Sequence, residues 1–193
     1  MNAASSMGSR DDDLSLIEGL KSREPHAFEI FVETFGPAIF RFSRLKLGDA
    51  AAAEDASQEI FLKAFMKIDT LNSERLFPWV LKIARNHCFD ILRKRMRTPE
   101  TPVDFTADAI DRVGDEALTA EAINRTSNEA IPEMPSILLG LTGQEREIVL
   151  LRVIEELEYC DIAQITGMVE GSIRNAFSRA MRRLREGAES DEM

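Results

Sequence analysis

The sequence is poor in the residues that most often carry catalysis or metal binding. Its 193 residues include two cysteines, Cys88 and Cys160, and two histidines, His26 and His87. None of the four has a Cys or His partner at the spacing of a metal site. The sequence therefore argues against a zinc site, a disulfide scaffold and a histidine-based catalytic triad. We expect no enzymatic activity, no metal and no other cofactor.

Long apolar runs are also missing. No stretch approaches the roughly 18 residues that a membrane-spanning helix needs, and the first residues lack the apolar segment of a secretory signal. We therefore expect a cytoplasmic protein without membrane insertion. Proline, glycine and tyrosine are sparse, with seven, ten and one residues. This scarcity argues against an all-β chain rich in turns and favours amphipathic helices.

Apolar residues recur with the period of a helix in two separate parts of the chain. We predict an all-α fold in which two small helical domains are joined by a flexible acidic linker. In the linker, nine Asp and Glu residues stand against Arg112 and Arg125, which is too acidic a composition to pack well alone. The expected segments are a disordered tail at 1–13, a first domain at 14–97, the linker at 98–136, a second domain at 137–187 and a tail at 188–193.

Local signals predict where several helices begin and end. In the first domain, Pro25 suits the first turn of a helix, Gly36-Pro37 should interrupt that helix, and Gly48 should end its continuation. In the second domain, Thr142 and Glu145 have the spacing of a capping box. A short helix at 159–166, a glycine turn and a final helix at 170–186 then predict a helix-turn-helix.

Positive charge gathers on one face of the helix predicted at 77–97, although the whole chain carries a net charge of −10. On a helical wheel of about 100° per residue, this face lies opposite the apolar residues and also carries Phe89. Cations interleaved with aromatic rings suit contact with phosphates and stacking on unpaired bases. A solvated basic face with Trp79 in the core is the alternative. The candidate residues are Trp79, Lys82, Arg85, Asn86, Arg93, Lys94 and Arg95.

The last helix presents a second polar and cationic face, opposite Ile173, Phe177 and Ala180. The first residues of a recognition helix reach base edges in the major groove, where Arg and Asn pair bidentately with guanine and adenine. An ordinary surface helix is the alternative. The candidate residues are Ser172, Arg174, Asn175, Ser178, Arg179 and Arg182.

An acidic cluster precedes both basic faces. Asp55, Gln58 and Glu59 share one helix face by their i, i+3 and i+4 spacing, and the next turn is apolar and includes Phe61. Paired carboxylates can carry acid–base chemistry, but no nucleophile, metal ligand set or glycine-rich phosphate loop accompanies them. We therefore interpret the cluster as a protein-docking patch, with a merely solvated face as the alternative.

Three motifs taken together give the sequence a resemblance to bacterial sigma factors of the sigma-70 family, specifically the small extracytoplasmic-function (ECF) group. Any one motif is only moderately specific, whereas three in this order are much more so. Residues 53–62 resemble the region 2.2 motif, 79–86 with 90–95 resemble region 2.4, and 141–147 resemble the start of region 4, whose helix-turn-helix is completed by 162–163, 171–174 and 179–180.

The resemblance implies a factor that directs promoter-specific initiation of transcription. Asp55, Gln58, Glu59 and Phe61 would dock on the clamp helices of the largest subunit of core RNA polymerase, and region 4 would contact the β flap. The first basic face would hold melted −10 promoter DNA, and the last helix would read the −35 duplex. The resemblance also implies control by an anti-sigma factor.

Two other functions remain open on the residues alone. A stand-alone helix-turn-helix transcriptional regulator explains the second domain but leaves the acidic cluster without a role. A sigma-like adaptor without promoter reading finds support in Ala176, which stands where many relatives carry a basic or polar residue. We further expect Cys88 in the core, His87 on a helix surface, and a weak helix start at Glu158.

Overall fold

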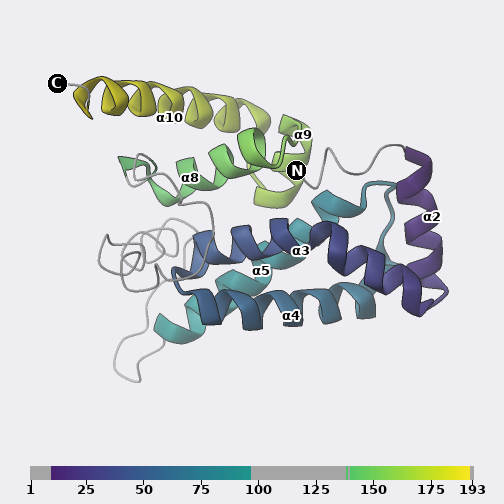
Figure 1. Ribbon diagram of the computed structural model, residues 1–193. Helices are drawn as coiled ribbons and strands as arrows, with labels where there is room; N and C mark the ends of the chain where they lie inside the picture. The colour runs from purple at the N-terminus through teal and green to yellow at the C-terminus, as the bar shows by residue number, and fades with distance from the viewer. Residues whose placement is uncertain (1–9, 97–137, 139, 192–193) are drawn as a thin grey trace.

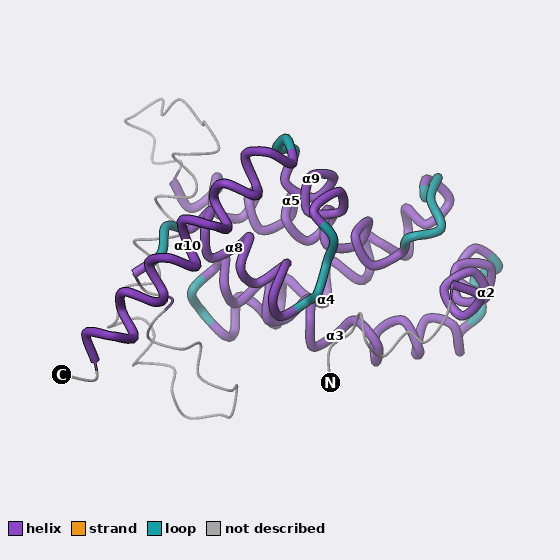
Figure 2. The backbone as a smooth tube through the Cα atoms, turned by 90° about the horizontal axis from the view of Figure 1, so that it is seen from above, coloured by secondary structure: helices purple, strands orange, loops and turns teal. Residues whose placement is uncertain are grey.

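The structure, a computed structural model, describes residues 10–96, 138 and 140–191. All the regular elements in these residues are helical, as predicted (Figure 2). None of the helices in this part of the chain is long and apolar enough to span a membrane. The predicted linker, residues 1–9 of the first predicted tail and residues 192–193 of the second lie outside the described residues. Residues 188–191, which the sequence assigned to the second tail, instead continue the last helix.

The first domain is built from three long helices and a shorter one across their end (Figure 1). The shorter helix, α2, begins at Arg10, before the predicted start of the domain. The phenylalanines of the domain meet in its centre, where Phe31, Phe35 and Phe42 are at most 1% exposed. The elements are α2 (Arg10–Lys21), α3 (Pro25–Leu47), α4 (Ala50–Lys67), the 3-10 helix η1 (Ile68–Thr70) and α5 (Leu76–Met96).

The ends of α3 and α4 follow the predicted signals. Pro25 lies in the first turn of α3, and Gly48 ends the helix in a left-handed conformation, with φ of 72°. Glycine adopts this conformation without the steric cost that a Cβ atom imposes. The chain then turns directly into α4, whose first turn is capped by Asp49, because its carboxylate accepts a hydrogen bond of 2.7 Å from the backbone N–H of Ala52.

The prediction that Gly36-Pro37 interrupts a helix is wrong. Helix α3 runs unbroken from Pro25 to Leu47, with Pro37 inside it. A proline in a helix removes one backbone hydrogen bond and usually costs about 3 kcal/mol. Here Phe35, Ala38 and Ile39 on either side are completely buried, so packing of the continuous helix against its neighbours offsets that cost.

The second domain begins with the predicted capping box. The Thr142 hydroxyl accepts from the backbone N–H of Glu145, and the Glu145 carboxylate accepts from the backbone N–H of Thr142. Gly167 forms the predicted turn with φ of 75°, and Glu158 makes no side-chain cap, as expected. The elements are α8 (Gly143–Val149), the π-helical segment η3 (Leu150–Ile154), α9 (Tyr159–Thr166) and α10 (Glu170–Asp191).

The two domains pack against each other in the described residues. Helix α9 lies against α5, and α8 approaches α3 (Figure 1). One cluster of buried apolar residues continues from α3, α4 and α5 into the second domain, where it includes Ile148, Leu151 and Ile162. Helix α10 lies on the outside of this arrangement, along α8 and α9.

Replacing Gly19 by alanine should destabilise the first domain. A Cβ atom at Gly19 on α2 would lie 2.7 Å from the Cβ atom of Ala27 on α3, so the two helices would have to separate. Overpacking of this kind costs about 1–3 kcal/mol, which urea unfolding would measure. Gly171→Ala on α10 is the control, because no atom beyond its chain neighbours and its own helix backbone lies within 4 Å of its Cβ position, so it should leave stability unchanged or raise it by up to about 1 kcal/mol. Equal stabilisation by both variants would contradict the contact.

Candidate nucleic-acid interface

Helix α10 has a buried face and an exposed face, as the wheel predicts. Ile173, Ala176 and Ala180 are completely buried against the rest of the second domain. The structure brings all the predicted residues of this helix together on its opposite, solvent-exposed face. These are Ser172, Arg174, Asn175, Ser178, Arg179 and Arg182.

The side chain of Arg174 is supported from its own domain. Its guanidinium group lies 4.3 Å from the centroid of the Tyr159 ring, a cation–π contact, and donates a hydrogen bond of 3.3 Å to Glu170. The side chain is nevertheless 58% exposed. Tyr159 therefore limits the positions that this arginine can adopt near the N-terminal end of α10.

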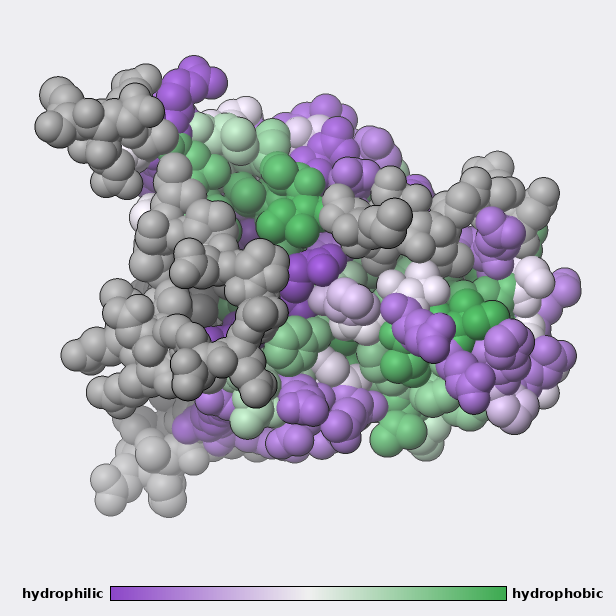
Figure 3. All heavy atoms as spheres, in the orientation of Figure 1, coloured by the Kyte–Doolittle hydropathy of each residue, from purple (hydrophilic) through white to green (hydrophobic). Residues whose placement is uncertain are grey.

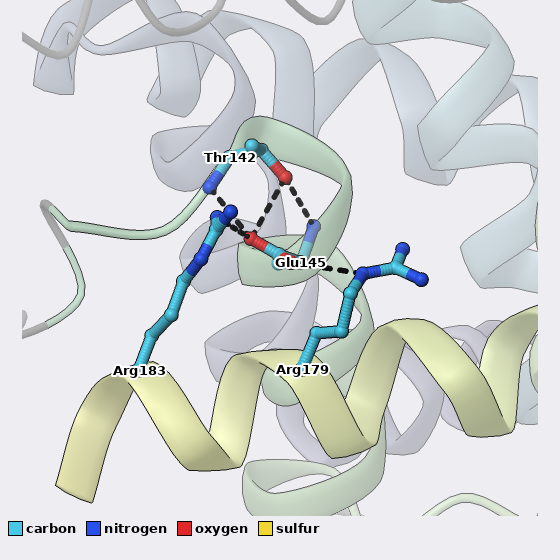
Figure 4. A network of polar contacts seen from close by, with 4 residues as sticks. All are labelled: Thr142, Glu145, Arg179 and Arg183. Carbon is cyan, nitrogen blue, oxygen red and sulfur yellow. Dashed lines mark hydrogen bonds and ion pairs between the residues drawn. The ribbon is translucent and has the colours of Figure 1, made fainter. Parts of the chain in front are cut away.

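Glu145 ties the start of α8 to α10 (Figure 4). This carboxylate is only 3% exposed and, besides closing the capping box, accepts a hydrogen bond of 2.6 Å from Arg183. Its other oxygen lies 3.7 Å from Nε of Arg179. A buried carboxylate therefore fixes the position of α10 on its domain. Sequence reasoning recognised the cap but missed this link, because it depends on two residues about 35 positions further along the chain.

Ala176 gives no support to a loss of DNA reading. Its side chain is completely buried, on the face of α10 that packs against the domain. A residue at this position contacts the interior, so its small size is explained by packing. The adaptor interpretation therefore loses the support that Ala176 gave it in the sequence.

The basic face of α5 is only partly as predicted. Lys82, Asn86, Lys94 and Arg95 are exposed, and Arg93, 41% exposed at its side chain, donates to Asp90. The aromatic residues do not share this exposure. Trp79 is half-buried and packs on the core. Phe89 is 7% exposed, so its assignment to the outward arc is wrong.

Arg85 lies on the same helix but does not face solvent. Its side chain is 13% exposed, and its Nε donates a hydrogen bond of 2.8 Å to Glu147 of α8 in the second domain. The guanidinium group also covers the ring of Phe89, 4.2 Å from its centroid. In this arrangement the second domain covers one of the predicted DNA contacts.

His87 is buried and not on the helix surface, contrary to expectation. It is 6% exposed, and its Nδ1 lies beside the ammonium group of Lys63 on α4. Burial, reinforced by the positive charge of Lys63, lowers the pKa of His87. The lowered pKa favours the neutral ring at neutral pH.

The two cysteines should differ sharply in reactivity. Cys88 is completely buried beside Ser43, as expected of a core residue, and burial raises the pKa of its thiol to about 11. Cys160 is exposed. Since the thiolate is the reactive form, iodoacetamide at neutral pH should modify Cys160 in the folded chain and Cys88 only after denaturation. Mass spectrometry of the intact chain would count the labels, and rapid double labelling of the folded chain would contradict the burial.

The acidic cluster lies on the outside of α4. Asp55, Gln58 and Glu59 are exposed, and Glu59 lies 3.6 Å from Lys63. Phe61, which the sequence placed beside them, is 5% exposed and packs edge-to-face on Phe31, with ring centroids 5.1 Å apart. Phe61 is therefore a core residue, and any contribution it makes to docking is as support from beneath.

Two apolar residues extend the acidic face of α4, and sequence reasoning missed them. Leu62 is 57% exposed and Met66 is 75% exposed. They follow Glu59 by three and seven positions, which keeps them on the same helix face. That spacing was a signal in the sequence that could have identified them. The outer face of α4 thus combines carboxylates with exposed apolar side chains, a composition suited to protein docking.

Comparison with known proteins assigns both domains to one family. The family model for sigma-70 region 2 matches residues 31–98, and the model for sigma-70 region 4 matches residues 133–184. ECF RNA polymerase sigma factor SigW of Bacillus subtilis is 26% identical over 178 residues, which cover 88% of this chain and 93% of SigW. ECF RNA polymerase sigma factor SigC of Mycobacterium tuberculosis is 30% identical over 169 residues, covering 86% of each chain.

A solved structure shows the same fold. The sigma factor RpoE in complex with the anti-sigma factor NepR, from Bartonella quintana, superposes with a TM-score of 0.60 at 24% identity and covers 85% of this chain and 98% of that one. The resemblance seen in the sequence motifs is thus confirmed over both domains. The chain belongs to the ECF group of the sigma-70 family of RNA polymerase sigma factors.

Proposed function

We propose that this sigma factor divides promoter recognition between three helices. The outer face of α4 docks on core RNA polymerase, the exposed cations of α5 hold the melted −10 strand, and α10 reads the −35 duplex. The observation that carries this assignment is the exposed set of six polar and cationic residues on α10, in a domain that matches sigma-70 region 4.

The two DNA-facing helices would read DNA in different ways. On α10, Arg174 and Asn175 stand near the helix N-terminus, where side chains of a recognition helix reach base edges. On α5, the exposed residues include Lys82, Lys94 and Arg95, whereas Phe89 is buried. We therefore infer that α5 contacts mainly phosphates, and that stacking on bases depends on Trp79 or on other segments.

The acidity of the chain supports a role that depends on polymerase. A net charge of −10 opposes the approach of DNA, whose phosphates dominate affinity. The outer face of α4 contributes to this charge. Once these carboxylates are covered by the polymerase, the basic faces of α5 and α10 can act with less repulsion. The free chain should accordingly bind promoter DNA weakly at moderate salt.

The proposed function also has consequences for where the chain acts and for what regulates it. We infer that a chain that works with RNA polymerase acts in the cytoplasm, and that its recognition of DNA strands requires no catalytic group of its own. The Bartonella quintana relative was solved with an anti-sigma factor, and a partner of that class would suit a chain whose docking face carries exposed Leu62 and Met66. We propose such a partner here as well.

Run-off transcription on genomic fragments tests the proposed function. Purified core polymerase should produce transcripts with discrete starts only when the chain is added. Failure to bind core polymerase, or no new start sites, would overturn the proposal. A gel shift of specific fragments by the chain without polymerase would instead indicate a stand-alone regulator.

A further inference from the structure

Beside the apolar cluster that the two domains share, their contact contains buried charges, and these charges are divided by sign. Three carboxylates of the second domain, Glu147, Glu155 and Asp161, are at most 1% exposed. Each is paired with cations of the first domain. Figure 3 shows hydrophilic residues at the boundary between α8 and α3, between two more hydrophobic areas. The four cations are Arg41 and Lys46 on α3, Arg75 just before α5, and Arg85 on α5.

Glu147 is held by two cations at once. One of its oxygens lies 2.6 Å from Nζ of Lys46, and the other accepts a hydrogen bond of 2.8 Å from Nε of Arg85. Burial by itself would raise the pKa of Glu147, but the charges and hydrogen bonds of Lys46 and Arg85 outweigh it and lower the pKa. Glu147 therefore remains ionised in the contact, and its single negative charge is shared between the two cations.

Among the residues that the structure describes, Glu155 pairs with Arg41 and Asp161 pairs with Arg75. One oxygen of Glu155 accepts hydrogen bonds of 3.0 and 2.7 Å from Nε and Nη2 of Arg41. An oxygen of Asp161 lies 2.7 Å from Nη2 of Arg75, whose side chain is 52% exposed. Burial raises the pKa of both carboxyl groups, against the opposing effect of their arginines. The arginines therefore offset only part of the energetic cost of burying these two carboxylates.

The buried ion pairs between the two domains favour a contact that can open over one that is permanently packed. Apolar residues also cross this boundary, but buried ion pairs add little net stability compared with apolar side chains, although they fix one arrangement. Interfaces that contain buried charge in this way resemble those of domains that move relative to each other. The proposed function also requires opening. By their names, the −35 and −10 elements lie about 25 base pairs apart, which is roughly 85 Å of duplex at 3.4 Å per step. Here α9, which packs on α10, lies directly against α5.

We propose that Glu147, Glu155 and Asp161 form an intramolecular latch that closes the chain by occupying a phosphate-binding strip. The strip consists of Arg41, Lys46, Arg75 and Arg85. Carboxylate and phosphodiester oxygens are both charged acceptors for Arg and Lys, so the three side chains stand in for DNA phosphates. When the domains separate, the strip becomes available and extends the proposed −10 surface by Arg41, Lys46 and Arg75. The phosphate part of this proposal rests on the proposed function.

A triple variant that removes the latch charges tests this proposal. We expect Glu147→Gln/Glu155→Gln/Asp161→Asn to raise the radius of gyration measured by small-angle X-ray scattering, at unchanged helical circular dichroism. Its affinity for a fluorescein-labelled single-stranded oligonucleotide of mixed sequence should rise at least tenfold. Up to four additional contacts between cations and phosphates should also steepen the salt dependence of binding by up to roughly 3 in log–log slope, at about 0.7 per phosphate contact on a single strand.

The matched control removes the same three charges elsewhere. Glu18, Glu29 and Glu33 are exposed on α2 and α3, so Glu18→Gln/Glu29→Gln/Glu33→Gln separates the latch from a simple change in net charge. Equal radius or equal DNA affinity in the two triple variants would overturn the proposal. The radius depends on neither DNA nor polymerase, so a missing latch and a failed proposed function give different results.

A charge exchange keeps the proposal testable if the triple variant does not fold. Arg41→Glu alone would face Glu155 with a like charge and should open the chain. Arg41→Glu combined with Glu155→Arg restores opposite charges and should return both the radius and the DNA affinity toward those of the unchanged chain. An Arg41→Glu variant as compact as the double variant would overturn the latch.

Discussion

Reversing the charge of Arg174 should lower promoter-dependent transcription by roughly 10- to 100-fold. A bidentate contact between an arginine and a base contributes about 1–3 kcal/mol of discrimination, and each 1.4 kcal/mol corresponds to about tenfold in binding. Arg174→Glu removes such a contact and adds repulsion from phosphates. The fold should be nearly unaffected, because the 58% exposed side chain makes only surface contacts, an ion pair with Glu170 and a cation–π contact with Tyr159. Run-off transcription by the reconstituted holoenzyme would measure the loss.

The control for Arg174→Glu is a charge reversal away from the candidate interface. Lys21 is an exposed residue in the last turn of α2, so Lys21→Glu changes the net charge by the same amount. We expect near-normal transcription from Lys21→Glu. An equal loss in the two variants would indicate a general charge effect, and full activity of Arg174→Glu would remove α10 from promoter reading.

Short-range signals in the sequence predicted the local structure well. The capping box of Thr142 and Glu145, the left-handed glycines Gly48 and Gly167, and the start of α3 at Pro25 all depend on residues within one or two turns. Their physical causes are local backbone hydrogen bonds and steric limits. For the same reason, helix α9 was predicted with its observed bounds.

The sequence was less informative where the face of a helix had to be decided. On α4, Phe61 and Leu62 are adjacent and both apolar, yet Phe61 is 5% exposed and Leu62 is 57% exposed. On α5, Phe89 and His87 turned out to be buried. When the apolar face of a helix is broad, the sequence alone does not show which of its edge residues are buried, because this depends on where the neighbouring helices pack. The unbroken α3 at Pro37 likewise depends on long-range packing.

The charged contact between the domains was not foreseeable from the sequence. Arg41, Lys46, Glu147 and Glu155 are residue types that are almost never fully buried unless paired. The paired residues lie 62 positions apart along the chain for Arg85 and Glu147 and 114 positions apart for Arg41 and Glu155. The pattern in the sequence was therefore that of solvated helix faces, and only the three-dimensional structure shows that the opposite charges meet.

The second large effect is expected when exposed apolar residues on the outer face of α4 are replaced by polar ones. Leu62→Ser/Met66→Ser should weaken binding to core RNA polymerase by roughly 10- to 100-fold, since covering each exposed apolar side chain gains about 1–2 kcal/mol. The free chain should keep its stability within about 0.5 kcal/mol, because surface substitutions seldom change it more. Titration of fluorescently labelled chain with core polymerase would give the affinity, and urea unfolding the stability.

The matched control for this variant replaces two other exposed apolar residues of the same domain. Leu14 on α2 and Ile30 on α3 are 37% and 38% exposed, and Leu14→Ser/Ile30→Ser should leave polymerase binding nearly unchanged. If both double variants bind equally well, Leu62 and Met66 do not form the docking surface. If only the α4 variant loses affinity, Leu62 and Met66 belong to the same docking face as Asp55, Gln58 and Glu59. Binding to polymerase would then explain why these two apolar side chains are exposed in the free chain.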